Sequence, residues 1–182
     1  MTEQAKAQNI QLGEYDRLTS VMMYTSNAMI WGKVIAKQAV RVSTWLRTDM
    51  VPKYFQIVDA NVLLTQSGQS VAPLKFDLIS VQTDQIDAFH LIPPAEEALD
   101  YDPDEPNRIM VPTIAIVHIF QFDGYTRMSE VTNLTAYLSS SKGDFLPLYD
   151  VKMTSPALPK IKGLQAPYLL IRQSKVMFAE KT

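Results

Sequence analysis

The stretch "TAYLSSSKGDFLPLYDVKM", residues 135–153, decides the expected fold because an earlier stretch repeats its pattern. The earlier stretch reads "TWLRTDMVPKYFQIVDANV" and covers residues 44–62. In each stretch, an aromatic residue followed by leucine precedes an apolar run that leads into an aspartate. The matched positions are Trp45 with Tyr137, and Asp59 with Asp150.

The match continues on both sides of these stretches. Gly32 precedes Gly124 by ninety-two residues, and residues 79–81 precede residues 169–171 by ninety. The matches keep their order along the chain, and the spacing slips by single residues in loop-like places. Self-similarity at a nearly fixed spacing is the sequence signature of repeated structural units. We therefore expect an internal duplication.

Apolar and polar residues alternate through most of each unit, which predicts β-strands. The clearest predicted strands cover residues 54–64 and 145–154. Each unit closes with another alternating stretch, residues 76–91 or 167–179, which is expected to form a final hairpin. The economical interpretation is a small, strongly bent sheet formed twice.

Turns and short helices separate these strands. Two-residue turns are expected at Ser26-Asn27 and at Asp123-Gly124, because Asp-Gly is a favourable turn pair. Short helices are expected near residues 42–47 and 134–139, with Ser43 and Asn133 as N-caps. The predicted fold class is mainly β with short helices, in two tandem small barrel-like or strongly bent-sheet units related by internal duplication.

Composition indicates a soluble globular protein. Of the 182 residues, 47% are hydrophobic and 20% are charged. The longest apolar stretch, "IAIVHIFQF" from Ile114, is about half as long as a membrane span. The polar beginning, "MTEQAKAQN", lacks the apolar region of a secretion signal. These features predict a cytoplasmic protein with no membrane span.

The net charge of −2 is unevenly distributed. Residues 95–108, "AEEALDYDPDEPNR", carry a net charge of −5 and stand among several prolines. Proline removes backbone donors and like charges repel, so this segment is expected to be an extended, solvated linker. The predicted organisation is an N-terminal segment at 1–20, a first β repeat at 21–93, an acidic linker at 94–108 and a second β repeat at 109–182.

This order of elements resembles the SH3-like and Sm-like small β-barrels. The residues that carry the resemblance are Gly32 in an early strand, Asp59-Ala60 in a later strand, and "IRQSKV" from Ile171. The chain is also similar to a group of uncharacterised bacterial domains with the pattern R-x-S-x-x-L…F-L-x-L-x-D-A, met here as "RVSTWL" and "FLPLYDV". The resemblance implies a small-barrel fold. Its implication of RNA binding is weakened because Tyr54 and Phe145 replace the Sm-type asparagine before the Asp-Ala strand.

Several kinds of chemistry find no support in the sequence. The chain has no cysteine, which excludes disulfides, thiolate metal sites and cysteine nucleophiles. The segment "DYDPDE" has part of the spacing of a calcium loop, but Glu105 and Val111 stand where glycine and a bidentate glutamate are required. Neither histidine, His90 nor His118, belongs to a known nucleophile motif. We therefore expect no catalytic residue, no metal site and no cofactor. A buried carboxylate beside His118 would revive an enzymatic interpretation.

The second repeat carries a mild excess of positive charge, with a net charge of +3 over residues 109–182. Basic residues interleaved with aromatic residues are the pattern that single-stranded nucleic acids bind. The nucleic-acid candidates are Lys160, Lys162, Arg172 and Lys175, with Tyr149, Tyr168 and Phe178 as possible stacking partners. The alternative interpretation is an ordinary solvated face.

Two functions remain open from the sequence. The first is a non-enzymatic protein-interaction or assembly module, which presents strand edges and a mobile acidic connector to a partner protein or to further copies of itself. Residues 21–25 and 114–122 are the stretches expected to pair with other strands. The alternative is an Sm-like protein that binds RNA or another nucleic acid through the second repeat.

Overall fold

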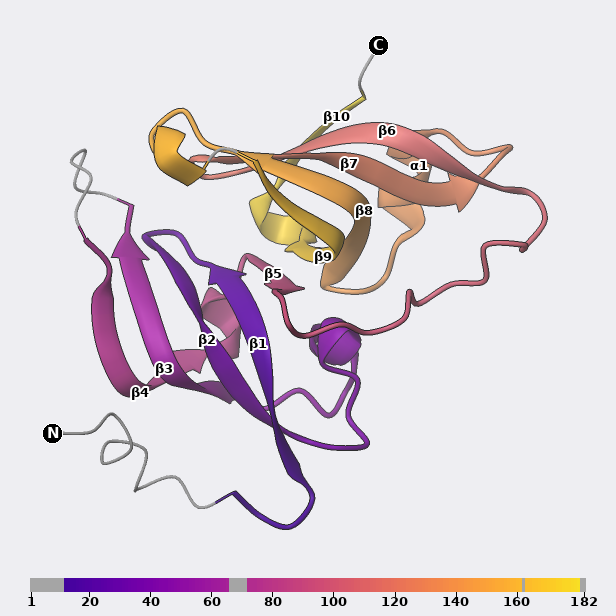
Figure 1. Cartoon of the computed structure of the whole chain (residues 1–182). Helices are drawn as coiled ribbons and strands as arrows, with labels where there is room; N and C mark the ends of the chain where they lie inside the picture. The colour runs from indigo at the N-terminus through magenta and orange to yellow at the C-terminus, as the bar shows by residue number, and fades with distance from the viewer. Residues whose placement is uncertain (1–11, 66–71, 162, 181–182) are drawn as a thin grey trace, which may run out of the picture.

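The computed structural model describes residues 12–65, 72–161 and 163–180. These residues form one antiparallel sheet of ten strands, with only short helices beside it (Figure 1). The predicted mainly β fold with short helices is therefore confirmed. Among the described residues, no helix is long and apolar enough to cross a membrane.

The strands fall into two halves along the chain. The first half comprises β1 (Asp16–Tyr24), β2 (Ala28–Lys37), the 3₁₀ helix η2 (Val42–Arg47), β3 (Tyr54–Leu64), β4 (Leu74–Gln82), the 3₁₀ helix η3 (Thr83–Gln85) and β5 (Ala88–Leu91). The second half comprises β6 (Arg108–Val117), β7 (Phe120–Ser129), α1 (Leu134–Ser140), β8 (Phe145–Thr154), the 3₁₀ helix η4 (Pro159–Ile161), β9 (Leu164–Arg172), the 3₁₀ helix η5 (Gln173–Lys175) and β10 (Met177–Glu180). The strands expected at 54–64 and 145–154 are confirmed.

The two halves place their strands in the same order. The full sheet runs β10-β6-β7-β8-β9-β5-β1-β2-β3-β4, so each half begins with its last strand and ends with its fourth. The sequence left open barrel-like or strongly bent-sheet units; the sheet is not closed into a barrel, because β10 and β4 lie at its opposite ends. Figure 1 shows two bent parts, with β1–β4 in one and β6–β10 in the other. Whether duplication produced this order stays a prediction.

A short ladder joins the halves at the centre of the sheet. β5 pairs antiparallel with β9 through Ala88–Ile171 and Phe89–Leu170. One further backbone bond continues the ladder, from the Arg172 N–H to the Asp87 carbonyl at 2.8 Å. β5 therefore lies between β1 of its own half and β9 of the other.

Gly32 and Gly124 lie at equivalent irregularities where each half bends. The β2–β3 register shifts around Gly32, and the β7–β8 register shifts around Gly124. A Cβ on Gly32 would lie 2.7 Å from the Val58 carbonyl oxygen, and one on Gly124 would lie 2.8 Å from the Tyr149 carbonyl oxygen. Only glycine permits this approach of two backbones.

The aspartates across from these glycines have left-handed backbone conformations. Asp59 has φ 51° and Asp150 has φ 49°, values that aspartate tolerates better than most residues. Both aspartates lie inside strands, at the register shifts. A bulge bends a strand and strengthens its twist, so these positions account for the bent sheet.

One predicted turn is correct and one is wrong. Ser26-Asn27 joins β1 to β2 as expected. The β6–β7 turn, however, lies at His118-Ile119, where His118 has φ 53°. Asp123-Gly124 is inside β7, because the glycine is needed for the close approach to β8 rather than for a turn.

The predicted final hairpins are also wrong. β4 pairs only with β3, whereas β5 pairs with β1 and β9. Likewise, β9 pairs with β8, and β10 pairs with β6. In both halves a 3₁₀ turn redirects the chain, so that the final strand crosses to the first strand of its half instead of folding back.

Both predicted helices are present, but only one has the predicted cap. The Asn133 side chain accepts a hydrogen bond from the Ala136 N–H at 2.8 Å, which confirms it as the N-cap of α1. Arg41, not Ser43, is at the N-cap position of η2, and its side chain makes no capping bond. The amides at the start of η2 are bound instead by a distant carboxylate, described below.

Two hydrophobic clusters fill the interior, and each draws residues from both halves. One contains Val21, Ile57 and Phe89 of the first half together with Phe145 and Leu170 of the second. The other contains Phe122 and Leu148 of the second half with Tyr24 and Met29 of the first. The two halves therefore contribute to shared cores.

We expect Gly32→Ala and Gly124→Ala each to lower the free energy of unfolding by about 1–3 kcal/mol, because the added methyl group overpacks a backbone contact. Urea denaturation measures this change. Gly143→Ala is the control, since its Cβ would meet only the Phe145 oxygen at 3.6 Å. Equal stability of all three variants would contradict the close-approach account of the bends.

Candidate functional site

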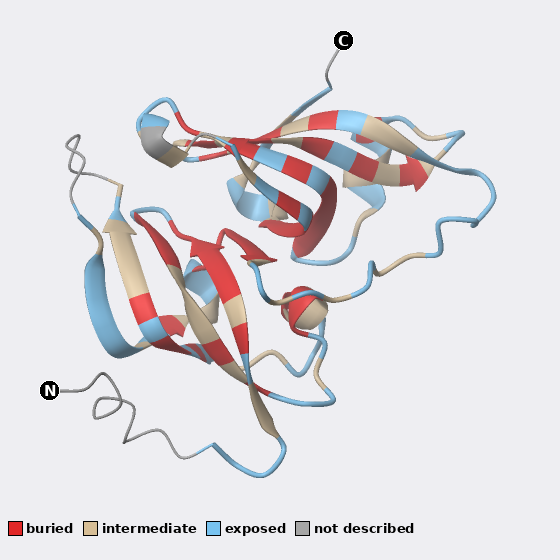
Figure 2. Cartoon of the chain, viewed as in Figure 1, coloured by how far each residue is buried: buried red, intermediate tan, exposed pale blue. Residues whose placement is uncertain are grey.

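The strand β4 is a long, open edge of the sheet. It has nine residues and pairs on one side only, with β3. Its apolar residues Leu74, Phe76 and Leu78 are 46%, 43% and 45% exposed. Alternation places these three side chains on one face of the strand and the charged residues between them on the other. Figure 2 shows β4 as an exposed outer strand beside more buried neighbours.

Two opposite charges separate these apolar residues. Lys75 and Asp77 are both exposed, and neither side chain forms a hydrogen bond or ion pair within the part of the chain that the structure describes. Edge strands offer unpaired backbone N–H and C=O groups, to which another strand can add. The segment from Leu74 to Leu78 is therefore the candidate functional site, an interaction edge.

The stretches that the sequence assigned to strand pairing are not edges. Residues 21–25 belong mostly to β1, which lies between β2 and β5. Residues 114–122 span the β6–β7 turn, and Ile114–Ile116 already pairs with β10 on one side and β7 on the other. Both stretches are occupied within the chain, so this prediction is wrong. The other end of the sheet, β10, has only four residues.

The acidic segment at 94–108 makes specific contacts with both halves of the chain. Its Glu97 carboxylate accepts hydrogen bonds from the Val42 and Ser43 N–H groups at 2.9 Å each, and from the Ser43 hydroxyl at 2.6 Å. Arg17 adds a salt bridge at 2.7 Å. This carboxylate thus caps η2 from more than fifty residues away. Most of residues 94–108 are exposed, as the sequence predicts, but Glu97 is half-buried and has basic and amide partners.

Hydrogen bonding also sets the protonation of Glu97. Partial burial alone would raise the pKa of this carboxyl group, but the bonds from Ser43, Val42 and Arg17 outweigh burial and lower it. The folded state therefore favours the carboxylate. Its contribution to stability is present above the ordinary glutamate pKa and is lost as pH falls through the lowered value.

A second acid anchors the segment to the other half. Asp100 accepts hydrogen bonds from the Tyr149 hydroxyl at 2.8 Å and the Tyr168 hydroxyl at 3.0 Å. It also forms a salt bridge with Arg47 of η2 at 2.6 Å. Burial, together with the neighbouring carboxylate, raises the pKa of both tyrosines. Asp100 therefore joins η2 to β8 and β9.

The segment continues along the second half through aromatic and charged contacts. The Arg127 guanidinium lies 4.5 Å from the centre of the Tyr101 ring, and Tyr101 meets Tyr149 edge to face. Arg127 also bonds the Asp102 carbonyl and forms a salt bridge with Glu105. In Figure 1 the segment runs along one side of both halves. We call residues 94–108 the acidic strap.

Among the described residues, three members of the predicted nucleic-acid set, Tyr149, Tyr168 and Arg172, already have partners within the chain. Tyr149 and Tyr168 are buried and bound to Asp100, so neither offers a ring for base stacking. Lys175 is exposed in η5. The side chain of Lys160 and all of Lys162 lie outside the described residues.

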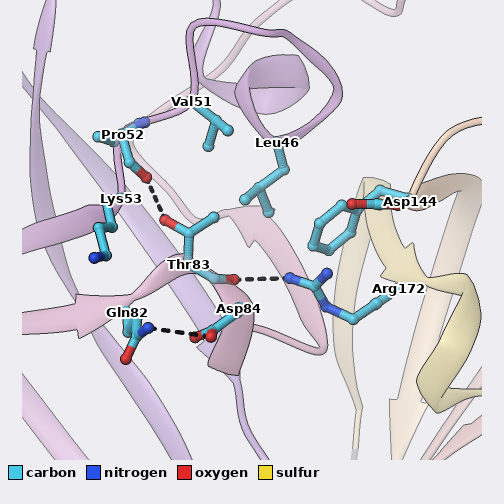
Figure 3. Close-up of a pocket in the computed structure, with 10 residues that line it drawn as sticks. Leu46, Val51, Pro52, Lys53, Gln82, Thr83, Asp84, Asp144 and Arg172 are labelled. Atoms are coloured by element: carbon cyan, nitrogen blue, oxygen red, sulfur yellow. Dashed lines mark hydrogen bonds between the residues drawn. The ribbon is translucent and has the colours of Figure 1, made fainter.

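Arg172, the remaining nucleic-acid candidate, has partners at the junction of the halves. Its guanidinium donates to the Ile86 carbonyl at 2.9 Å and to the Thr83 carbonyl at 2.8 Å. It also lies over the Phe145 ring at 4.5 Å. Figure 3 shows Arg172 reaching across to η3 at the wall of a pocket that Lys53 and Asp144 also line. This arginine holds the two halves together.

His90 is buried beside Tyr24 in the core. A carbonyl oxygen only accepts, so the Leu91 carbonyl at 2.8 Å from Nδ1 fixes the proton on that nitrogen. Nε2 then accepts from the Tyr24 hydroxyl at 3.0 Å. Burial lowers the pKa of His90 to about 4 and raises the pKa of Tyr24. The histidine is thus a neutral structural group at physiological pH.

His118 pairs with a buried carboxylate across the junction. Its Nε2 lies 2.8 Å from an oxygen of Asp87, whose side chain is only 4% exposed. Asp87 precedes β5 and His118 is in the β6–β7 turn, so the pair connects the halves. This is the arrangement that would revive an enzymatic interpretation. Within the described residues, however, His118 forms no hydrogen bond with a hydroxyl or amine that could act as a nucleophile.

The residues that defined the sequence match take equivalent places in the two halves. Trp45 lies on η2 and meets the Phe55 ring edge to face at 5.0 Å. Tyr137 lies on α1, where burial raises the pKa of its hydroxyl. Asp59 forms a salt bridge with Lys33 at 3.0 Å. These are structural roles, and the structure brings none of the matched pairs together as a site.

Sequence reasoning missed the interaction edge and the strap contacts. The available signal for the edge was the alternation "LKFDL", residues 74–78, in which three apolar residues enclose opposite charges. Its position at the end of the sheet depends on long-range pairing. No signal in the local sequence indicated that Glu97 and Asp100 have partners fifty residues away.

Comparison with known proteins gives no relative: no family model, no curated protein and no solved structure matches this chain. The proposals below depend on the geometry of the chain itself.

We expect Glu97→Gln to lower the free energy of unfolding by about 1–3 kcal/mol, because the amide cannot replace the charge and all the bonds of the carboxylate. Cleavage of the acidic strap by a protease should also become faster. Urea denaturation and limited proteolysis measure the two effects.

The matched control is Glu96→Gln, which removes an exposed charge at the neighbouring position. If the two variants behave alike at neutral pH, Glu97 does not anchor the strap. The difference between them should shrink in acid and disappear once the pH is below the lowered pKa of Glu97, where the wild-type carboxylate is also protonated.

Proposed function

We propose that this chain is a non-enzymatic protein-interaction or assembly module that receives a partner strand along β4. The observation that carries the proposal is the nine-residue edge with Leu74, Phe76 and Leu78 exposed side by side. Strand addition satisfies the open backbone groups, and alternate side chains give specificity. Burial of the three apolar side chains would add a hydrophobic contribution.

The other half of the chain supports this proposal with a related pairing. β9 holds the position in the second half that β4 holds in the first, and the end of its outer edge, Leu170–Arg172, is covered by β5 and the residue before it. Strand addition to the end of this strand therefore already occurs within the molecule. A duplication of one five-strand unit would account for the shared order and for the open outer edge of β4.

The acidic strap supports a rigid module rather than a flexible tether. Glu97 and Asp100 bind groups in η2, β8 and β9, and the two cores include residues of both halves. A rigid scaffold holds its edge strand ready for a partner, which lowers the ordering cost of binding. The strap thus contributes to binding by fixing the sheet.

The Asp87–His118 pair fits a junction role better than catalysis. An acid–base dyad acts on a reacting group held beside the second imidazole nitrogen. Here the pair joins the two halves beside the β5–β9 ladder, close to the backbone bond between Arg172 and Asp87. The alternative of nucleic-acid binding stays a prediction, with less support now that Arg172 is bound to two carbonyls.

The double variant Phe76→Lys with Leu78→Lys tests the proposed edge, because lysines on an edge strand oppose strand addition. Tagged full-length chains are used to capture bound chains, further copies included, from lysate of the native source. We expect the wild type to retain bound chains and the double variant to lose them.

The control carries the same change of charge away from the edge. Met50→Lys with Val131→Lys alters residues that are 82% and 94% exposed, and neither lies in β4. This control should bind as the wild type does. Equal capture by all three proteins, or by none, would show that β4 is not an interaction surface.

A further inference from the structure

The five residues Leu74–Leu78 are nearly symmetric about their centre. Leucine stands at both ends, Phe76 is in the middle, and a lysine and an aspartate occupy the two positions between. Read in reverse, the apolar positions are unchanged and the two charges exchange places. In an antiparallel pair of identical strands, the sequence of one strand lies opposite the reversed sequence of the other. For this segment, apolar residues then lie opposite apolar residues, and each lysine lies opposite an aspartate.

We propose that the strand received by β4 is β4 of a second copy of this chain, paired antiparallel about a two-fold axis through Phe76. This inference rests on the proposed function, since it names the partner of the same edge. In this register Phe76 faces Phe76 of the second copy, and Leu74 faces Leu78. On the opposite face, Lys75 meets Asp77 of the second copy, and symmetry repeats that ion pair.

Neighbouring registers are less favourable. Moving the axis to Lys75 places two lysines opposite each other, and moving it to Asp77 places two aspartates opposite each other. Like charges directly opposite across strands are destabilising. Moving the axis to a point between two residues shifts the register by one, so that an apolar residue such as Phe76 is opposed to a charged one such as Lys75. A one-residue shift no longer matches the apolar faces of the two strands. The charge pattern therefore selects the axis through Phe76.

Proline and the adjoining backbone limit the length of the ladder. Pro73 has no N–H to donate and would stand opposite Ile79 of the second copy. The pairing therefore covers five residues of each chain. An exposed apolar edge with opposite charges at fixed positions favours one defined pairing over indefinite stacking.

A head-to-tail assembly, in which β4 receives β10 of the next copy, is the competing arrangement. It would imitate the internal β9–β5 ladder. That ladder is held by Arg172 on β9 and by Asp87 before β5. At the ninety-residue spacing of the sequence match, Gln82 of β4 corresponds to Arg172, and Met177 of β10 corresponds to Asp87. Glutamine and methionine carry no charge, so they cannot form the contacts that the arginine and the aspartate make. The polar groups that fix the internal ladder are thus missing from the competing one.

A single cysteine tests the axis directly, because the chain has no other cysteine. Across an antiparallel pair the Cα atoms lie about 4.5–5.5 Å apart, within the range for a disulfide. Phe76→Cys in the full-length protein should therefore form a covalent dimer with oxidised glutathione. Leu74→Cys is the control, since its two copies would lie about 14 Å apart, four residues along the ladder. Leu74→Cys mixed with Leu78→Cys should cross-link.

Charge exchange gives an independent measurement by analytical ultracentrifugation. Lys75→Glu alone, or Asp77→Lys alone, should weaken the dimer by about tenfold or more, because two attractions become two repulsions. An equimolar mixture of the two variants should restore the dimer as a mixed species. The double variant with both changes should restore it with itself.

The outcomes separate this inference from the proposed function. A monomer with no cross-link at Phe76 overturns self-pairing, and the capture experiment then decides whether β4 receives a different chain. Larger assemblies without a Phe76 cross-link would indicate the head-to-tail arrangement and would also overturn the two-fold pairing. Dimers with the Phe76 cross-link and restored charge mixtures support it.

Discussion

The arrangement of the sheet depends on the short ladder between β5 and β9. Only Ala88–Ile171 and Phe89–Leu170 pair there, yet this contact makes one sheet of two similar halves. It also decides which strand edges stay open. β9 gains β5 as a second neighbour, whereas β4, its counterpart, has only β3. Arg172 and the Asp87–His118 pair support the ladder with side-chain contacts across the same junction.

The acidic strap gives the junction a second connection at some distance from the ladder. Its carboxylates are separated by only two residues in the chain, but Glu97 binds the first half and Asp100 binds mainly the second. Charges that would repel one another in a free linker are thus distributed among different basic and hydroxyl partners. Stability and function are connected here, because a fixed junction keeps β4 in place as an edge.

Local patterns predicted the elements well and their partners poorly. Alternation was sufficient to place β3 and β8, and Asn133 was identified as a cap because its target amide is three residues away. Asp123-Gly124 was misread as a turn because a glycine needed for backbone contact looks the same in sequence as a glycine needed for a turn.

The functional edge could not be predicted for the same reason. Which strand lies at the end of a sheet follows from every other pairing, and β5 crosses to β1 and β9 instead of folding back on β4. The acids of the strap appeared solvated because their partners, Ser43 and Tyr168 among them, lie far away in the chain. Sequence therefore predicted the strand content, while the site emerged only from tertiary structure.

Hydrogen exchange tests the central claim, that the outer side of β4 is open while the end of β9, Leu170–Arg172, is covered. The Lys75→Glu protein, kept dilute, supplies the monomer in which the two strands can be compared. Alternate amides of Leu74–Leu78 should exchange rapidly, and the amides of Leu170–Arg172 should be protected by β8 and β5. Equal protection of both segments in the monomer would contradict the account, because β4 would then have a second neighbour within its own chain, besides β3.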